Sequence, residues 1–255
     1  MIDLHTHILP GLDDGAEVMA ESLAMAELAL EGGTNIIVAT PHSNQSGRFE
    51  NYCSDALTKA FDAFERALAE NYLPLKVYRG MEIYASWDMD EKIADGRLSG
   101  IGDSDYYLIE FPFDIDADDM GSMLESVLSI GKIPVIAHPE RYGCVQYYPG
   151  VLYEWMMMGC LSQINKGSVF GRFGRGAAKT AEILLAFNLV TCIASDAHSA
   201  DMRTTYMGDI RDALEERMDS EYVRALLYEH PKAILENRKI AFLGSPPVRR
   251  RRIFR

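Results

Sequence analysis

Five of the six histidines, and several acidic residues, stand at the ends of short apolar segments. His5 and His7 are two residues apart, so in an extended strand both imidazoles point to the same side. The remaining residues of this kind are His42, Glu82, Glu110, His138, Asp196 and His198. Each alone has an ordinary explanation, such as a glutamate that pairs with an arginine. Imidazoles and carboxylates without thiolates suit manganese, iron or zinc, so their shared position predicts a metal centre.

This set of residues contains more ligands than one ion needs, which predicts two or three ions. Burying several carboxylates together with imidazoles is costly unless cations neutralise them. A carboxylate such as Glu82 can bridge two ions, and a water or hydroxide shared between the ions is then the natural nucleophile. The pattern therefore indicates metal-assisted hydrolysis.

Two arginines close to these residues are candidates for binding a phosphoryl group. Arg141 follows His138 by three positions, so its guanidinium can grip phosphate oxygens bidentately. A salt bridge to Glu140 or another acidic residue is the alternative. Arg203, five positions after His198, is a second candidate. None of the four cysteines has an arginine six positions later, which excludes the Cys-x5-Arg loop of cysteine-dependent phosphatases.

Seven apolar segments would position these residues, and each is followed by a helical pattern or a long loop. The predicted strands are 1–7, 35–40, 75–79, 106–109, 133–137, 161–165 and 189–195. The predicted helices are 17–32, 54–71, 117–131, 150–159, 172–188, 221–228 and 231–237. This alternation is typical of parallel βα units, and in a (β/α) barrel the chemistry lies at the carboxyl ends of the strands.

The composition limits the setting in which the protein acts. The 25 basic against 38 acidic residues leave a net charge of −13, which argues against nucleic acid as a partner. We find no signal peptide, no apolar run of about 18 residues and no Cys-x-x-Cys, so we expect a cytoplasmic protein. The sequence gives no indication of oligomeric state.

The end of the chain differs from the rest, because five of its last eight residues are arginines. We expect one domain over residues 1–243 and a basic tail over 244–255. The tail is either a solvated segment or a peripheral contact with an anionic membrane or an acidic partner.

The order of short motifs resembles the polymerase-and-histidinol-phosphatase (PHP) superfamily, and within it the bacterial tyrosine-protein phosphatases of capsule and exopolysaccharide synthesis. The motifs that carry the resemblance are Asp-Leu-His-Thr-His at 3–7, Thr-Pro-His at 40–42, Gly-Met-Glu at 80–82, Ile-Glu-Phe-Pro at 109–112, Ala-His-Pro-Glu-Arg-Tyr at 137–142, Gly-Ser at 167–168 and Ser-Asp-Ala-His at 195–198. The loop at 8–15, together with His-Pro-Glu-Arg, favours the phosphatase branch over histidinol phosphatases.

The resemblance implies a distorted, TIM-like (β/α)7 barrel with a trinuclear centre, usually of manganese; iron, cobalt and zinc are alternatives. It implies three ligand sets: His5, His7, Glu82 and Asp196; Glu82, Glu110 and His138; and His42, His198 and Asp14, with Asp13 as the alternative to Asp14. Arg141 would bind phosphate and stabilise the transition state. One departure is Ser43, where family members usually carry a second histidine.

The function implied is that of a protein-tyrosine phosphatase, in which a metal-bridging hydroxide attacks phosphorus. The implied substrate is a bacterial tyrosine kinase that controls polysaccharide export. The alternative is a PHP-family phosphoesterase acting on a small monoester such as histidinol phosphate.

Overall fold

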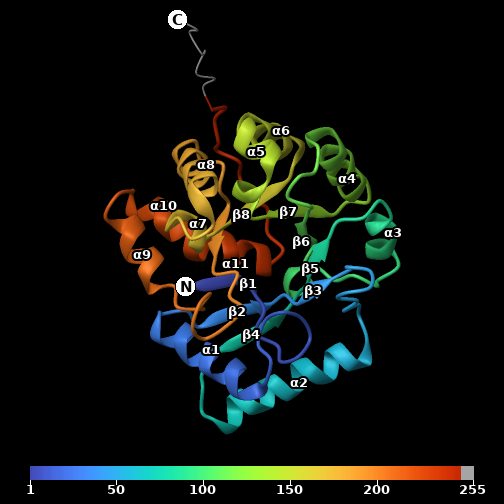
Figure 1. Ribbon diagram of the computed structural model, residues 1–255, viewed down its shortest axis with the longest axis vertical. Coiled ribbons are helices and arrows are strands. Elements are labelled where there is room, and N and C mark those ends of the chain that lie inside the picture. The colour runs from blue at the N-terminus through green and yellow to red at the C-terminus, as the bar shows by residue number, and fades with distance from the viewer. Residues whose placement is uncertain (248–255) are drawn as a thin grey trace, which may run out of the picture.

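Parallel strands form the centre of the protein. The computed structural model describes residues 1–247, and helices surround the strands (Figure 1). The strands are β1 (Ile2–Thr6), β2 (Ile36–Ala39), β3 (His42–Ser43), β4 (Lys76–Arg79), β5 (Glu82–Tyr84), β6 (Tyr106–Glu110), β7 (Ile133–Ala137), β8 (Leu161–Asn165) and β9 (Cys192–Ala194). Among the described residues every pairing between named strands is parallel, which confirms the predicted α/β class.

Two of the predicted strands are each followed closely by a further short strand. The sheets have the orders β1-β2-β4 and β3-β5-β6-β7-β8-β9. The chain runs from β2 through Pro41 into β3, and from β4 through Gly80 into β5, so both sheets share these two segments. The predicted ends of the strands at 40 and 79 are thus confirmed to within one residue, but His42 and Glu82 lie in two further short strands that were not predicted, where they are paired with each other. A proline lacks the N–H of a regular ladder, which explains the break before β3.

The last strand returns to the first. The amide of Asp196, just after β9, donates to the His5 carbonyl in β1 at 3.0 Å. The amide of His7 donates to the Ala197 carbonyl at 2.9 Å. These two bonds bring both ends of the strand order together, so the strands enclose a barrel.

The longer helices follow their predicted positions because their apolar residues recur with helical spacing. In α2, Phe61, Phe64 and Leu68 form the buried face, and the Ser54 hydroxyl accepts from the Leu57 amide as an N-cap. The helices are α1 (Met19–Glu31), α2 (Asp55–Glu70), α3 (Met89–Ala94), α4 (Ala117–Ser129), α5 (Gly143–Tyr147), α6 (Gly150–Met158), α7 (Lys166–Val169), α8 (Gly174–Ala186), α9 (Gly208–Glu215), α10 (Ser220–Arg224) and α11 (His230–Leu235). Short 3-10 turns cover Ile101–Asp103 and Pro139–Arg141, and a π-helical turn covers Ala225–Glu229.

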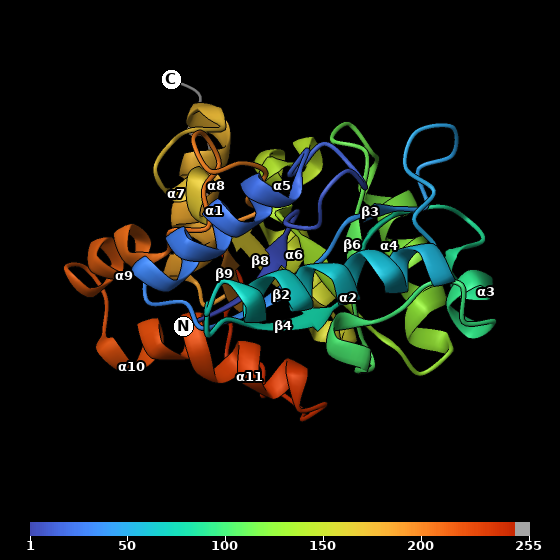
Figure 2. The same ribbon diagram turned by 90° about the horizontal axis from the view of Figure 1, so that it is seen from below.

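The amino ends of the strands are closed by apolar residues. Ile234 of α11 and Ile101 pack with strand residues such as Leu108 and Val135 in one buried cluster. Figure 2 shows α10 and α11 along this end of the barrel. Within residues 1–247, no helix combines the length and apolarity that a membrane span requires. The arginines of the predicted tail, at 249–252 and 255, lie outside the described residues.

Candidate active site

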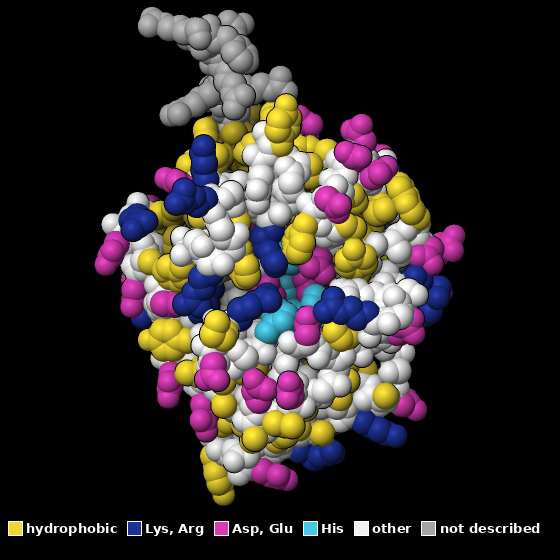
Figure 3. All heavy atoms as spheres, in the orientation of Figure 1, with side chains coloured by type: hydrophobic (Ala, Val, Ile, Leu, Met, Phe, Trp, Pro, Cys, Tyr) yellow, Lys and Arg dark blue, Asp and Glu magenta, His cyan; other side chains and the backbone are white. Residues whose placement is uncertain are grey.

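The carboxyl ends of the strands open into a cleft of about 950 Å³. In Figure 3 the histidines and acidic side chains lie in a hollow with Lys and Arg side chains around it. Nine of the eleven predicted site residues line this cleft: Asp14, His42, Glu82, Glu110, His138, Arg141, Asp196, His198 and Arg203. The other two, His5 and His7, are fully buried next to the lining carboxylates. All eleven residues therefore come together.

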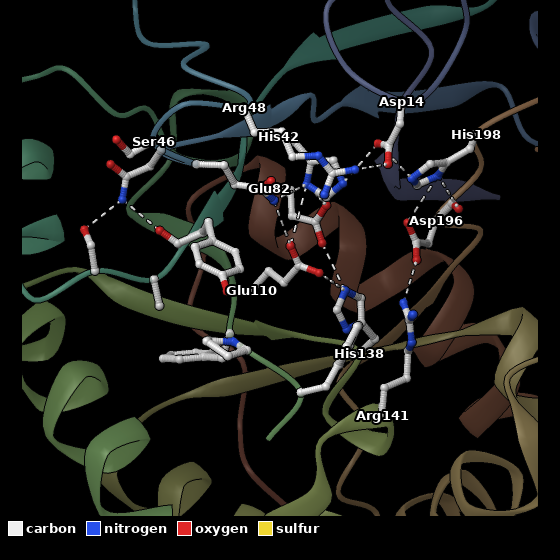
Figure 4. A pocket seen from close by; sticks show the side chains of 18 of the residues that line it. Asp14, His42, Ser46, Arg48, Glu82, Glu110, His138, Arg141, Asp196 and His198 are labelled. Atoms are coloured by element: carbon white, nitrogen blue, oxygen red, sulfur yellow. Dashed lines mark hydrogen bonds and ion pairs between the residues drawn. The ribbon is translucent and has the colours of Figure 1, made fainter. Parts of the chain in front are cut away.

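Glu82 is at the centre of the group. Its Oε2 atom lies 3.2 Å from the Nε2 atoms of both His5 and His7, and 3.0 Å from Nδ1 of His42. Its other oxygen lies 3.0 Å from Nε2 of His138. Figure 4 shows the side chains of Glu82, His42 and His138 pointing toward one another. One carboxylate from β5 thus reaches four imidazoles from three different strand ends.

Two features of this cluster fit bound cations. Glu82 Oε2 is buried and makes no hydrogen bond among the described residues, although three imidazole nitrogens surround it. The Nε2 atoms of His5 and His7 are only 3.2 Å apart. Nitrogen lone pairs and carboxylate oxygens that converge on shared positions are what an ion requires.

Ligand-type atoms in the described residues form three overlapping groups, and within each group the atoms lie no more than 4.8 Å apart. The groups are His5, His7, Glu82 and Asp196; His7, Asp14, His42 and His198; and His42, Glu82 and Glu110. The first group equals a set implied by the family resemblance. The third contains His42 where the resemblance implied His138, but His138 Nε2 lies 3.0 Å from Glu82 and 3.6 Å from Glu110.

The two glutamates of the cluster have pKa values shifted in opposite directions. Burial alone would raise the pKa of Glu82, but His5, His42 and His138 outweigh it and hold this pKa well below its ordinary value. Burial and the neighbouring Glu82 raise the pKa of Glu110 to about 7. Glu110 thus lacks the positive charge that would keep it ionised, and a cation beside it would supply that charge.

One histidine of the site is held neutral. Burial, together with the nearby His7, lowers the pKa of His198 to about 3. A neutral imidazole has a free lone pair, so His198 is in the form that binds a metal ion.

The adjacent residues Asp13 and Asp14 make different contacts. Asp13 Oδ2 lies 2.7 Å from Nδ1 of His7 and accepts from the His42 amide at 2.9 Å. Asp14 Oδ1 lies 3.3 Å from His42 Nε2 and 3.6 Å from His198 Nε2. Asp13 therefore supports His7 from behind, while Asp14 faces the cleft.

Unusual backbone geometry places several of these residues. His138 directly follows β7, Asp196 is the second residue after β9, and the two have positive φ values of 34° and 50°. Such conformations cost an L-residue about 1–3 kcal/mol and cluster at functional sites. Gly15 allows the Asp13–Asp14 loop to approach His7, because a Cβ at this position would lie 2.1 Å from the His7 carbonyl oxygen.

The two predicted arginines meet at Asp196. Arg203 forms an ion pair with Asp196 Oδ2, and Nη1 of Arg141 lies 3.7 Å from the same oxygen. The Arg141 guanidinium carbon lies 4.4 Å from the ring centroids of both Phe113 and Phe173. Two aromatic faces thus fix the plane of this cation at the cleft.

Of the alternative salt bridges of Arg141, the one with another acid is present, at 3.7 Å from Asp196 Oδ2, and Glu140 has other partners. Glu140 Oε1 instead accepts from the Asn165 amide at 3.0 Å and from the Ser168 hydroxyl at 2.6 Å. Glu140 therefore ties its loop to the end of β8 and leaves Arg141 free to face the cleft.

Sequence reasoning missed four polar residues near the site. Arg48 Nη2 lies 3.2 Å from Asp14 Oδ2 at the rim, and Gln45 Nε2 lies 3.5 Å from Glu110 Oε2. Both belong to a loop without a recognisable pattern. Gln163 and Asn165 lie on β8, and their alternation within an apolar strand was a usable signal of an inward polar face.

Comparisons with known proteins agree with this geometry. The tyrosine-protein phosphatase YwqE of Bacillus subtilis is 36% identical over 254 residues, which cover 100% of this chain and 99% of YwqE. The tyrosine-protein phosphatase CpsB of Streptococcus agalactiae serotype V is 31% identical over 245 residues, which cover 94% of this chain and 100% of CpsB.

Solved structures support the fold. A structure from work on YwqE and Streptococcus pneumoniae CpsB, described as unique metal-dependent tyrosine phosphatases, matches with a TM-score of 0.90 and 35% identity, over 98% of this chain and 100% of that one. Dihydropyrimidinase from Brevibacillus agri shares the fold alone, with a TM-score of 0.57 and 8% identity over 92% of this chain and 70% of that one. The predicted barrel fold and the predicted phosphatase resemblance are confirmed.

The family of capsular polysaccharide synthesis proteins CpsB/CapC matches residues 1–236, nearly the whole barrel. This chain belongs to the CpsB/CapC family.

Proposed function

We propose that this protein is a metal-dependent protein-tyrosine phosphatase. The observation that carries the proposal is the convergence of four imidazoles on Glu82, inside a cleft that also holds Arg141 and Arg203. This combination suits hydrolysis of a phosphate monoester. Relatives that are similar over their full length are named tyrosine-protein phosphatases, which selects phosphotyrosine as the substrate.

Two or three manganese ions are the proposed cofactors, with iron, cobalt and zinc as alternatives. The proposed ligands are His5, His7, Asp14, His42, Glu82, Glu110, His138, Asp196 and His198. Asp14 is preferred to Asp13, because Asp13 is already engaged by the ring of His7 and the amide of His42. When bound, the ions supply a water of lowered pKa and neutralise charge on the phosphoryl oxygens.

Arg141 is the proposed catalytic and phosphate-binding side chain. The rings of Phe113 and Phe173 pack against its guanidinium and restrict its orientation before substrate binds. Binding phosphoryl oxygens therefore costs little additional side-chain conformational entropy. Arg203 is the second proposed phosphate contact. Its ion pair with Asp196 orients it at the cleft, where it lies beside Arg141.

The shape of the cleft favours a long phosphorylated side chain. His138 and Glu82 are about 1% exposed, whereas Phe113 at the rim is 44% exposed. A phosphotyrosine carries its phosphorus farther from the peptide backbone than phosphoserine does, so it reaches the buried group while its ring meets the aromatic rim.

The proposed partner is a phosphotyrosine-bearing bacterial tyrosine kinase of capsule or exopolysaccharide synthesis, in the cytoplasm. Membership in a capsular polysaccharide synthesis family supports this choice. Residues 1–243 are proposed as one catalytic domain, and 244–255 as a basic tail that contacts a membrane surface near such a kinase.

A turnover assay tests the function directly. Manganese-loaded protein should hydrolyse both an aryl phosphate and a phosphotyrosine peptide, and a chelator should abolish both activities. Histidinol phosphate is the comparison substrate, and a higher kcat/KM for it would replace this proposal with the small-ester alternative. Arg141→Lys keeps the charge but loses the bidentate fork, and kcat/KM should fall about 10- to 100-fold.

A further inference from the structure

Two side-chain amides connect two of the proposed metal ligands. His5 Nδ1 lies 2.8 Å from Gln163 Oε1, and Gln163 Nε2 donates to Asn165 Oδ1 at 2.9 Å. Asn165 Nδ2 then donates to Asp196 Oδ2 at 2.5 Å. All four side chains are buried, with exposures of 0–1%. A continuous chain of three hydrogen bonds therefore runs from β1 through β8 to Asp196, two residues after β9.

The carboxylate at one end sets the direction of every bond in this chain. Asp196 pairs with Arg203 and lies near Arg141, so it is ionised and can only accept. Asn165 must therefore turn its NH2 group toward Asp196 and its oxygen toward Gln163. Gln163 must in turn donate to that oxygen, which leaves its own oxygen facing His5. The reverse orientation would place two acceptors against each other.

The other end of the chain is the ring of His5. Because an amide oxygen only accepts, His5 Nδ1 must carry a proton. In a neutral imidazole the second nitrogen is then unprotonated. That nitrogen, Nε2, lies 3.2 Å from Glu82 Oε2 and 3.3 Å from Asp196 Oδ1. In the neutral form that binds a metal ion, His5 therefore presents a bare nitrogen beside Asp196 Oδ1, the carboxylate oxygen that the amides do not use.

We propose that Gln163 and Asn165 are positioning residues that fix His5 as its Nδ1–H tautomer and reserve Asp196 Oδ1 for an ion. This inference rests on the metal centre of the proposed function. Partners behind a ligand typically change metal affinity about 10- to 100-fold when they are lost. Both residues lie on one face of β8, two positions apart. This single strand therefore connects His5 of β1 with Asp196 in the loop after β9.

The tautomer is measurable in the wild-type protein, without any substitution. Zinc-loaded protein is diamagnetic, so long-range proton–nitrogen NMR correlations report which nitrogen of His5 carries hydrogen. The expected result is a proton on Nδ1 and zinc on Nε2. A proton on Nε2 would overturn the proposal.

Affinity for manganese alone is the second readout, measured by competition with a chelator. Gln163→Met keeps the length of the side chain but removes the amide, and it should weaken binding about 10- to 100-fold. Gln163→Glu keeps an acceptor opposite His5 Nδ1 but loses the donor that faces Asn165 Oδ1, so its affinity should lie between those of the wild type and Gln163→Met. Unchanged affinity in Gln163→Met would contradict the proposal, and wild-type affinity in Gln163→Glu would show that the bond to Asn165 does not matter.

A double-mutant cycle separates a connected chain from two independent structural residues. Gln163→Met and Asn165→Leu break the same chain, so the fold-loss of the double variant should be smaller than the product of the single losses. Independent, multiplicative losses would contradict the proposal.

Ser162→Ala is the matched control on the same strand. Ser162 Oγ donates to the Leu189 carbonyl at 2.6 Å and does not touch the amides. The control should lower the melting temperature and leave manganese affinity unchanged. None of these measurements uses a phosphoester, so their failure is distinguishable from a failure of the phosphatase assignment.

Discussion

The two ends of the strands hold opposite kinds of residue. At the amino end, Ile101 and Ile234 pack against apolar strand residues in one buried cluster. At the carboxyl end, the same strands deliver buried imidazoles and carboxylates around Glu82. Leu108 of this cluster and Glu110 of the site are only two positions apart on β6, so apolar and charged surroundings meet within one strand.

The two ends of the barrel contribute differently to stability and to function. Apolar burial stabilises the fold at about 25 cal/mol per Å² and needs no cofactor. Buried carboxylates and positive-φ residues such as His138 and Asp196 cost free energy in the absence of a cation. The apolar end thus supports a carboxyl end that is arranged for binding and chemistry, and the two ends should respond differently to substitution.

The largest expected effect is at the carboxyl end. Glu82→Gln removes the charge that four imidazoles surround, and kcat/KM should fall at least about 10³-fold, or ~4 kcal/mol of activation free energy. Metal content, measured on the same sample, should fall with it. Glu125→Gln, on the exposed side of α4, is the control and should change neither quantity. Full activity in the Glu82 variant would contradict the assignment of function to the carboxyl end.

Ile234→Ala tests the opposite end. Ile234 of α11 is fully buried, and truncating its side chain should lower the free energy of unfolding by about 2–5 kcal/mol, as measured by urea denaturation. Manganese affinity at a temperature where the variant is folded should stay at the wild-type value. If it fell as far as in the Glu82 variant, the two ends would not be separable.

Glu140 is a buried carboxyl at the functional end that receives no cation. Burial raises its pKa to about 7 from the ordinary 4.5, although hydrogen bonds from Ser168 and the Asn165 amide oppose the shift. Between these values the folded state binds more protons than the unfolded state, so the stabilisation present below pH 4.5 is lost as pH rises to 7. The change is about 3 kcal/mol, from roughly 2.5 units at ~1.36 kcal/mol each.

Glu140→Gln should remove this pH dependence. Relative to the wild type, the variant should gain about 3 kcal/mol of unfolding free energy between pH 4.5 and pH 8, measured by urea titrations at both values. A difference between the two proteins that stays constant with pH would show that Glu140 titrates normally.

The smallest expected effect is at the rim, where solvent weakens the contacts. Phe113→Ala removes one of the rings against Arg141, and kcat/KM for an aryl phosphate should fall about fivefold, or ~1 kcal/mol. Phe170→Ala is a matched control, since Phe170 is 40% exposed against 44% for Phe113. An equal loss in both variants would assign the effect to general surface packing.

The arrangement of the barrel was predictable because its signals are local. Each of the apolar segments forms a strand, and the ligand-type residues stand at or next to their carboxyl ends. Parallel strands bring such residues together at one end of the barrel, so a list of residues in sequence order already implied a shared cleft. The resemblance to phosphatases rested on the same short motifs.

The finer details depend on geometry that sequence patterns do not carry. Whether Asp13 or Asp14 faces the cleft is decided by side-chain directions in one loop. The continuation of strands past Pro41 and Gly80 depends on pairing between β3 and β5, which no local signal encodes. Helices α3, α5 and α7 have only 6, 5 and 4 residues, too few for a helical period to stand out.

The closure of β1 against the end of β9 has a consequence for the order of events during synthesis. Asp3 accepts from the Ser195 amide across 192 positions of sequence, so the first strand is made long before its last partner exists. At about 5–20 residues per second, this separation corresponds to roughly 10–40 seconds on the ribosome. During that interval His5 and His7 have no Asp196 or His198 beside them, so the proposed ligand set is complete only after most of the chain has been made.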